Sequence, residues 1–174
     1  MLLGASNTDP RDGSTWYKPE ARIKAGVVLA GTGNGGADLS DLGKKLVPFY
    51  GVNFSKMATP ALVVYGDEDI SPHLTMRGAD WCADSYALAP GPKDLLTLKG
   101  AKHGLGGISG WDAREMLDES PEQLALVQRM TWAYLRSQLY EEMGLGKRHV
   151  RPWRGLRGKG RLRVKREPSF ALYC

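Results

Sequence analysis

The sequence predicts an α/β protein, and this prediction rests on three observations. Apolar runs at residues 25–30, 61–65 and 95–98 show no alternation of polar and apolar side chains. Strands of this kind are covered on both faces, as in parallel sheets. Helical patterns follow the second and the third run. The alternation of strand and helix therefore indicates about three parallel strands with flanking helices.

The two predicted helices differ in how clearly their ends are marked. The first is indicated by apolar positions spaced by three and four residues, at Met76, Ala79, Ala83 and Tyr86. The second begins with Ser120 as N-cap, Pro121 at the first helical position and Gln123 at the third, the pattern of a capping box. Its apolar face extends to about residue 140 and comprises Leu124, Val127, Met130, Tyr134 and Leu135.

Charge divides the chain into an acidic body and a basic tail. Residues 147–166 hold ten of the 24 lysines and arginines and no acid, so the remaining chain has more acids than bases. We therefore separate a body, residues 1–143, from a tail, residues 144–174, in which the periodicity vanishes. The tail has three interpretations: a non-native end of the kind a frameshift produces, a disordered appendage, or a nucleic-acid-binding arm. The first two are preferred, and nucleic acid is not the expected partner.

Several classes of protein are not indicated. Cys82 and Cys174 are too distant and too differently surrounded to suggest a disulfide framework or a metal site, and they leave the compartment open. No apolar run approaches the roughly 18 residues of a membrane span, and residues 1–5 lack the features of a signal peptide. We expect no metal, because the acids and histidines at positions 67, 69, 73 and 103 form no compact ligand signature.

A glycine loop follows the first predicted strand. Residues 31–36 spell G-x-G-x-x-G, which can bind a pyrophosphate where it opens a long helix. Here Gly43, Pro48 and Gly51 interrupt the following segment, and no acidic residue stands between Asp41 and Asp67 to hold a ribose. We interpret these glycines as a tight loop after a strand, and expect no organic cofactor.

An acid and a histidine follow the second and third predicted strands. Asp69 lies in the segment Gly66-Asp67-Glu68-Asp69, and His103 lies in a glycine-rich segment after residue 98. Because neighbouring parallel strands end at the same edge of a sheet, these side chains can meet there. A carboxylate on one ring nitrogen of a histidine leaves the other nitrogen free to act as a base.

These residues resemble the α/β-hydrolase family, in which Gly-x-x-Asp after a strand is followed by a histidine in a later loop. The resemblance covers roughly residues 1–140, and residues 70–110 look similar to bacterial members of the dienelactone-hydrolase or chlorophyllase-like type. It implies that Asp69 is the acid and His103 the base of a serine hydrolase triad. It also implies a carboxylic ester of a small molecule as substrate, with no metal or organic cofactor.

The serine of this family pattern is missing. A G-x-S-x-G elbow requires glycines on both sides of the serine, but residues 4–8 lack the second glycine, and residues 107–111 have it one position early. Residues 1–5 resemble the end of the helix that follows the elbow. We therefore expect the C-terminal part of a hydrolase domain, inactive by itself. The alternative is a non-catalytic interaction protein whose basic tail contacts nucleic acid or an acidic partner.

The resemblance also has a consequence for association. In the family sheet the strand at residues 25–30 pairs with the strand that leads to the elbow. Without that partner, one edge of the sheet stays open. We expect low stability and self-association through this edge.

Overall fold

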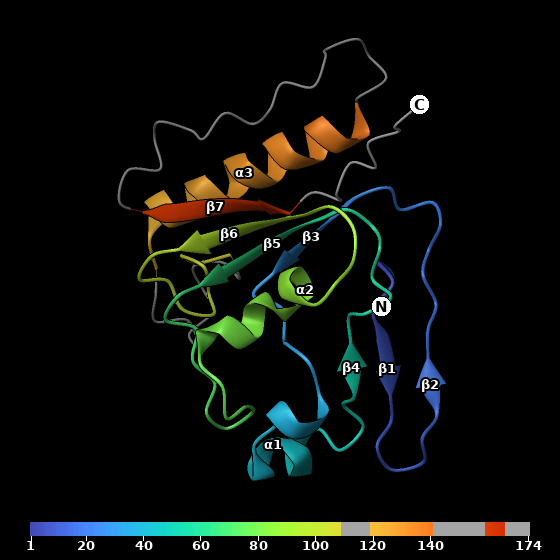
Figure 1. The fold of residues 1–174 in the computed structure, drawn as a ribbon. Helices are drawn as coiled ribbons and strands as arrows, with labels where there is room; N and C mark the ends of the chain where they lie inside the picture. The colour runs from blue at the N-terminus through green and yellow to red at the C-terminus, as the bar shows by residue number, and fades with distance from the viewer. Residues whose placement is uncertain (109–118, 141–158, 166–174) are drawn as a thin grey trace, which may run out of the picture.

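The computed structural model describes residues 1–108, 119–140 and 159–165, and a four-stranded sheet forms its centre (Figure 1). The strand order is β3 (Gly26–Leu29), β5 (Ala61–Gly66), β6 (Lys93–Leu98) and β7 (Gly160–Lys165). β3, β5 and β6 are parallel, whereas β7 pairs with β6 in the antiparallel direction. The three predicted parallel strands are therefore confirmed, and the protein has a mixed α/β architecture.

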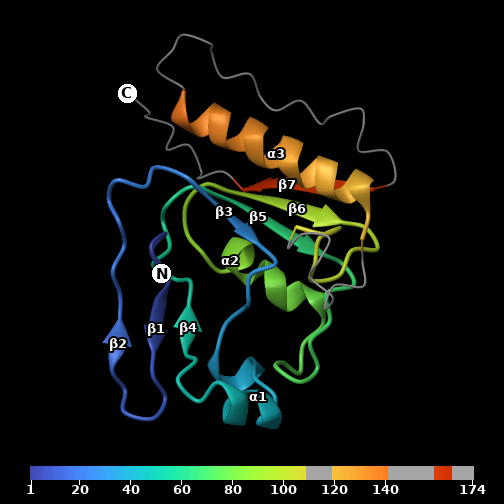
Figure 2. The same cartoon turned by 180° about the vertical axis from the view of Figure 1, so that it is seen from behind.

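Helices cover both faces of this sheet (Figures 1 and 2). Helix α3 (Pro121–Leu139) lies on one face, where Leu62 and Leu96 belong to the same buried cluster as Val127. The 3₁₀ helix η2 (Ala79–Ala83) and the short helix α2 (Asp84–Ala87) lie on the other face, where Val63 contacts Ala83. Burial of both faces explains why the strands are apolar throughout instead of alternating.

The N-terminus of α3 forms where the sequence predicts it. The Ser120 hydroxyl accepts a hydrogen bond from the Gln123 backbone N–H at 3.3 Å, and Pro121 occupies the first turn. The Gln123 side chain does not complete the capping box, because it donates to the Lys99 carbonyl at 3.0 Å. That contact attaches the start of α3 to the loop after β6.

The predicted helix over Met76–Tyr86 is wrong in its first part. Helical structure begins only at Ala79, and Met76 is 72% exposed instead of lying on a buried face. The backbone just before Ala79 forms hydrogen bonds that are not helical. Met76 N–H donates to the Asp38 carbonyl at 3.1 Å, and Arg77 N–H donates to the Thr75 hydroxyl at 3.1 Å. The tertiary contact to Asp38 and the local bond to Thr75 together override the helical pattern.

A second, small sheet has no counterpart in the sequence prediction. It is antiparallel, with β2 (Thr15–Trp16) and β4 (Val52–Asn53) on either side of β1 (Ser6–Thr8). Residues 1–5, which resemble a helix end in sequence, form a turn in which Gly4 N–H donates to the Met1 carbonyl at 2.9 Å. Strands of two or three residues are too short to show a period in the sequence.

Two short helical segments lie between β3 and β4. They are the 3₁₀ helix η1 (Gly36–Asp38) and helix α1 (Asp41–Leu46). Phe54 and Met57, which follow β4, pack with Ala61 of β5, so this part of the chain adjoins the main sheet.

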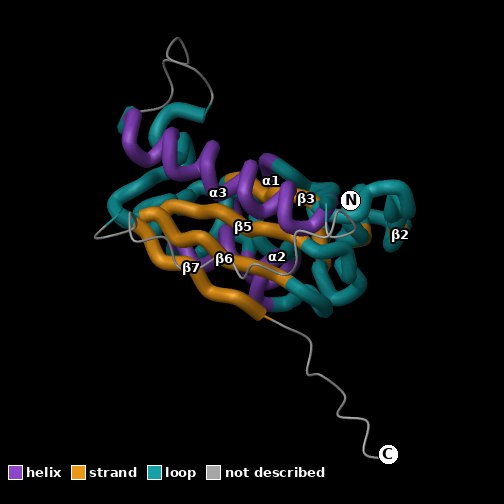
Figure 3. Tube along the Cα trace, turned by 90° about the horizontal axis from the view of Figure 1, so that it is seen from above, coloured by secondary structure: helices purple, strands orange, loops and turns teal. Residues whose placement is uncertain are grey.

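The interpretation of residues 144–174 as a disordered appendage is wrong for Gly160–Lys165, which forms β7. Its residues Arg161-Leu162-Arg163-Val164-Lys165 alternate charged and apolar types, which is typical of an edge strand. Leu162 packs against the cluster under α3, and the Lys165 ammonium donates to the Ala89 carbonyl at 2.9 Å. Viewed from above, β7 lies beside β6 at the outer edge of the sheet (Figure 3). Residues 144–158 and 166–174 of the tail lie outside the described residues.

The opposite edge of the main sheet is β3. The backbone N–H groups of Gly26 and Ala30 donate to the Pro60 and Val64 carbonyls on the β5 side at 3.0 and 2.9 Å. In a parallel strand, the residues between them, Val27 and Leu29, direct their backbone groups to the other side. Among the described residues no strand pairs with that side, and Leu29 is 39% exposed.

Candidate active site

Asp69 and His103 lie in contact at one edge of the main sheet. Asp69 follows β5 by three residues and His103 follows β6 by five, and these two strands are parallel neighbours. The His103 Nδ1 atom lies 3.1 Å from Asp69 Oδ2. The expectation that these two side chains come within hydrogen-bonding distance is thereby confirmed.

Backbone contacts between the two loops hold Asp69 in place. Asp67 N–H donates to the Leu98 carbonyl at 3.1 Å, and Glu68 N–H donates to the Ala101 carbonyl at 3.0 Å. A side chain at Gly66 would collide with the Ala101 carbonyl, so the glycine permits the close approach of the loops. The Gly66-x-x-Asp69 spacing thus directs the carboxylate inward, where it is 2% exposed.

The loop that bears His103 is fixed against the start of α3. Gly106 has φ +85°, and a Cβ there would contact the Ser120 carbonyl and Gln123. The Ser120 N–H donates to the Gly106 carbonyl at 3.1 Å. Glycine at this position therefore allows the loop to turn back on the start of α3.

Cys82 is a third member of the site that the sequence did not reveal. Its Sγ lies 3.4 Å from Asp69 Oδ2, the same oxygen that faces His103. Burial, followed by the charge of Asp69, raises the pKa of the Cys82 thiol to about 12, so it remains protonated and donates to the carboxylate. A lone cysteine in a helical segment gives no sequence signal for such a contact.

His103 leaves one ring nitrogen available. Its side chain is 55% exposed, and no described residue forms a hydrogen bond with Nε2. With a carboxylate on Nδ1, the neutral ring carries its proton there, and the lone pair of Nε2 can take a proton from another group. The pair therefore has the chemistry of a general base with an orienting acid.

Three other titratable residues of these loops, Asp67, Glu68 and His73, do not join the pair. Asp67 accepts a hydrogen bond from Gly100 N–H at 2.6 Å and so connects the two loops. Glu68 and His73 are exposed. In the described part of the chain no three His, Cys, Asp or Glu residues are grouped so that they could hold a metal ion.

No described hydroxyl or thiol is hydrogen-bonded to His103 Nε2. Ser6, in the segment that lacks a second glycine, lies in β1 with its Oγ 3.5 Å from the Asn53 carbonyl. Ser109, in the other serine segment, lies outside the described residues. A nucleophile for this base is thus not shown.

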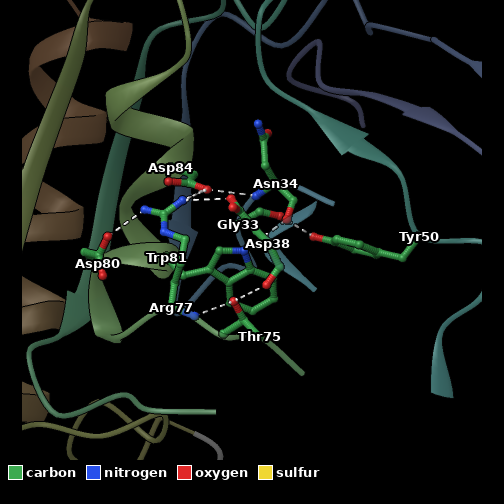
Figure 4. A network of polar contacts seen from close by, with 9 residues as sticks. All are labelled: Gly33, Asn34, Asp38, Tyr50, Thr75, Arg77, Asp80, Trp81 and Asp84. Carbon is green, nitrogen blue, oxygen red and sulfur yellow. Dashed lines mark hydrogen bonds and ion pairs between the residues drawn. The ribbon is translucent and has the colours of Figure 1, made fainter. Parts of the chain in front are cut away.

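The glycine loop after β3 is used internally (Figure 4). Asn34 N–H donates to Asp84 Oδ2 at 2.9 Å. Gly35 N–H donates to the Val52 carbonyl at 3.0 Å. A carboxylate therefore occupies the place where a phosphate would need free N–H groups. A Cβ at Gly33 would collide with Trp81, which shows that the glycine serves close packing.

Arg77 connects the glycine loop to the segment before α2 (Figure 4). Its guanidinium pairs with Asp80 at 2.6 Å, with Asp38 at 2.9 Å and with Asp84 at 3.0 Å. The hydrogen bond to Asp80, with those from the other carboxylates, raises the pKa of the Arg77 guanidinium. The guanidinium and its three carboxylates satisfy one another within the protein, whereas the buried Asn34 Oδ1 has no hydrogen-bond partner among the described residues. We regard the ion-pair network as structural.

Tyr50 extends this network on its other side. Its hydroxyl lies 2.7 Å from the Gly33 carbonyl oxygen. The same hydroxyl lies 2.6 Å from Thr32 Oγ1. The burial of the ring raises the pKa of Tyr50, although the hydrogen bond to Thr32 opposes that shift. Tyr50 thereby fastens the segment before β4 onto the glycine loop.

Comparison with protein-family models, with curated proteins and with solved structures finds no match for this chain. Within the described residues, no helix has the length and apolar character needed to cross a membrane. The site must therefore be interpreted from its own geometry.

Proposed function

We propose that Asp69 and His103 form the acid and base of a hydrolytic site of the α/β-hydrolase type, which cleaves a carboxylic ester of a small molecule. Asp69 orients the ring and stabilises the imidazolium, and His103 Nε2 takes the proton of a serine nucleophile. The serine comes from outside the described residues. Because no described hydroxyl or thiol is hydrogen-bonded to His103 Nε2, we expect the chain by itself to be inactive or nearly so.

The observation that supports this proposal is the asymmetry of the pair. Asp69 is buried and held by backbone contacts between two loops, whereas His103 is half-exposed with Nε2 unengaged by described residues. An ion pair that served only stability would not need an accessible ring nitrogen. The buried acid and the exposed base correspond to the division of roles in a triad.

The proton position on His103 provides a test that needs no nucleophile. In two-bond ¹H–¹⁵N NMR spectra at a pH where the ring is neutral, we expect His103 to carry its proton on Nδ1. In Asp69→Asn this preference should be lost, because the amide no longer requires a donor. His73→Gln serves as the matched control, since His73 is an exposed histidine of the neighbouring loop. A neutral His103 protonated on Nε2 in the unmodified protein would overturn the assigned role.

The absence of a nucleophile is tested separately with a fluorophosphonate probe, which labels activated serines covalently. We expect no labelling of the chain alone. Labelling that is lost in Ser109→Ala would identify Ser109 as the nucleophile and overturn our claim of inactivity, while leaving His103 as the base. Labelling retained in both Ser109→Ala and His103→Gln would argue against the hydrolase proposal itself.

A second candidate is the non-catalytic interaction protein. It is favoured by one observation, that β7 places Arg161 and Arg163 in an exposed position on the sheet. An acidic macromolecule bound through this surface would dissociate with increasing salt, and log Kd would rise linearly with log salt concentration. Retention of an RNA or DNA shift in His103→Gln, with no esterase activity from any reconstituted form, would favour this candidate over the hydrolase.

A further inference from the structure

A pocket outside the Asp69–His103 pair lies on the face of the sheet that also carries α2. Its volume is about 330 Å³, and it spans the carboxyl ends of β5 and β6 and the start of β7. It is lined by Tyr65, Asp67, Thr97, Lys99, Gly160, Arg161 and Arg163. This volume is at the lower end of the range found for small-molecule sites, so a small ligand is the appropriate occupant.

The strand register brings these side chains together. Tyr65 of β5, Thr97 of β6 and Arg161 of β7 are paired across the three strands and form one row. Arg163, two residues beyond Arg161, points to the same face of the sheet. Lys99 lies two residues after Thr97, one residue beyond the end of β6, and extends the same row. The pocket is therefore formed by alternate residues of three adjacent strands.

The two arginines of this pocket have no anionic partner within the described residues. Neither Arg161 nor Arg163 forms an ion pair there, and both are exposed. Their neighbours behave differently: Lys165 donates to the Ala89 carbonyl at 2.9 Å, and Lys159 lies 3.8 Å from Glu122. The pair of guanidinium groups thus differs from Lys159 and Lys165, the other described cations of β7 and its flank.

One carboxylate also lines the pocket. Asp67 Oδ1 accepts a hydrogen bond from Gly100 N–H at 2.6 Å, so a backbone amide already compensates part of the negative charge of this carboxylate. The pocket is lined by this one carboxylate and by three cationic side chains, those of Lys99, Arg161 and Arg163. The pocket consequently carries excess positive charge.

We propose that this pocket binds the phosphate group of a small phosphorylated molecule. Guanidinium groups donate in pairs to phosphate oxygens, and Lys99 adds a compact positive charge. The Thr97 hydroxyl supplies a further donor, and the Tyr65 ring forms a wall for the organic part of the ligand. The proposal is independent of the Asp69–His103 chemistry, because none of its residues belongs to that pair.

The test is a titration of the full chain with inorganic phosphate and with phenyl phosphate, at constant ionic strength maintained with chloride. Binding is followed by ¹H–¹⁵N NMR. We expect saturable shifts of the backbone amides at residues 97–100 and 160–163, with tighter binding of phenyl phosphate if Tyr65 contacts the organic group. Replacement of both guanidinium groups in Arg161→Gln/Arg163→Gln should raise Kd by about tenfold or more.

Two further variants separate loss of binding from loss of β7. Lys99→Gln lies outside β7 and should raise Kd by about threefold without disturbing the strand. Arg161→Lys/Arg163→Lys keeps the charge and removes the paired donors, so its Kd should fall between those of the unmodified protein and the glutamine variant. The matched control is Arg22→Gln/Arg136→Gln, which removes two exposed arginines outside the pocket.

Three results would overturn the proposal. The first is the absence of saturable shifts with either phosphate probe. The second is an equal loss of binding in the pocket variants and in the Arg22→Gln/Arg136→Gln control, which would indicate a general charge effect. The third is binding of a single-stranded oligonucleotide through these residues while both phosphate probes fail to bind, which would make the surface a nucleic-acid interface instead.

Discussion

The loop after β3 and the loops after β5 and β6 lie at the same carboxyl edge of one sheet, yet they use their polar groups in opposite ways. In the β3 loop, Asn34 N–H is bound to the Asp84 carboxylate, and Gly35 N–H is bound to a carbonyl. After β5 and β6, His103 is half-exposed and its Nε2 has no described partner. The loop with the better-known sequence motif is therefore the structural one.

This difference teaches that a motif predicts chemistry only if its polar atoms remain available. The β3 loop matches G-x-G-x-x-G, but its glycines allow Trp81 and the backbone near Tyr50 to approach. The Asp69 loop matches a much shorter pattern, but its geometry leaves a base accessible. Four predictions test the contrast between a structural network and an available site.

The largest expected effect is at Asp84, which is 2% exposed and joins Arg77 to the glycine loop. Asp84→Ala leaves the Arg77 guanidinium and Asn34 N–H without this acceptor, so we expect a loss of about 3 kcal/mol in the free energy of unfolding. Urea denaturation measures this change in the free energy of unfolding. The control is Asp80→Ala, which removes a 67% exposed partner of the same arginine and should cost less than about 1 kcal/mol. Equal costs would show that the network is not centred on Asp84.

The next effect concerns the glycines of the β3 loop. Gly33→Ala places a methyl group against the Trp81 ring and carbonyl, and we expect it to cost about 2 kcal/mol of unfolding free energy. Gly78→Ala is the control, because its φ is −79° and its nearest neighbour is at an ordinary contact distance of 3.4 Å. If Gly33→Ala is as stable as Gly78→Ala, close packing does not explain the motif.

The third prediction concerns the pH dependence of the Asp69 site. Burial raises the pKa of Cys82 from 9.0 to about 12, so the folded state holds the thiol proton more tightly than the unfolded state does. The resulting stabilisation is complete below pH 9 and is lost as pH rises toward 12, with a slope of up to about 1.4 kcal/mol per pH unit.

Cys82→Ala removes this contribution, so its unfolding free energy should decline less steeply above pH 9 than that of the unmodified protein. Denaturant unfolding between pH 8 and about pH 10.5 measures both slopes. Parallel curves would mean that the folded protein does not raise the pKa of the Cys82 thiol.

The smallest expected effect concerns the outer edge of β3, with which no described strand pairs. We expect the chain to self-associate through Val27 and Leu29, which direct backbone groups away from β5. A charge on an edge strand discourages such pairing, so Leu29→Lys should weaken association by about threefold, as measured by sedimentation velocity. Leu46→Lys, at an exposed leucine of α1, is the control. Association that is unchanged in Leu29→Lys would place the contact elsewhere.

Part of this structure could be predicted because its causes are local. Strands buried on both faces require continuous apolar runs, and this identified the segments that became β3, β5 and β6. The start of α3 could be predicted from Ser120 and Pro121, whose effect on a helix end depends only on their neighbours in sequence. The contact between Asp69 and His103 followed from the rule that parallel neighbouring strands end at one edge.

Other features depend on contacts between distant residues. Cys82 reaches Asp69 through the packing of η2 on the sheet, and Met76 is exposed because its backbone is bound to residue 38. β7 was recognisable in principle from the alternation in Arg161–Lys165, but its basic surroundings resembled a disordered tail. The pocket at Arg161 and Arg163 exists only because that strand pairs with β6.

The sequence by itself thus determined the parallel strands, the capped helix and the adjacency of an acid and a histidine, because each depends on burial or on a short-range backbone requirement. Only the tertiary structure decided which polar groups are satisfied internally and which remain available. That distinction depends on where distant segments place donors, acceptors and charges in three dimensions, and a linear pattern of residue types does not contain this information.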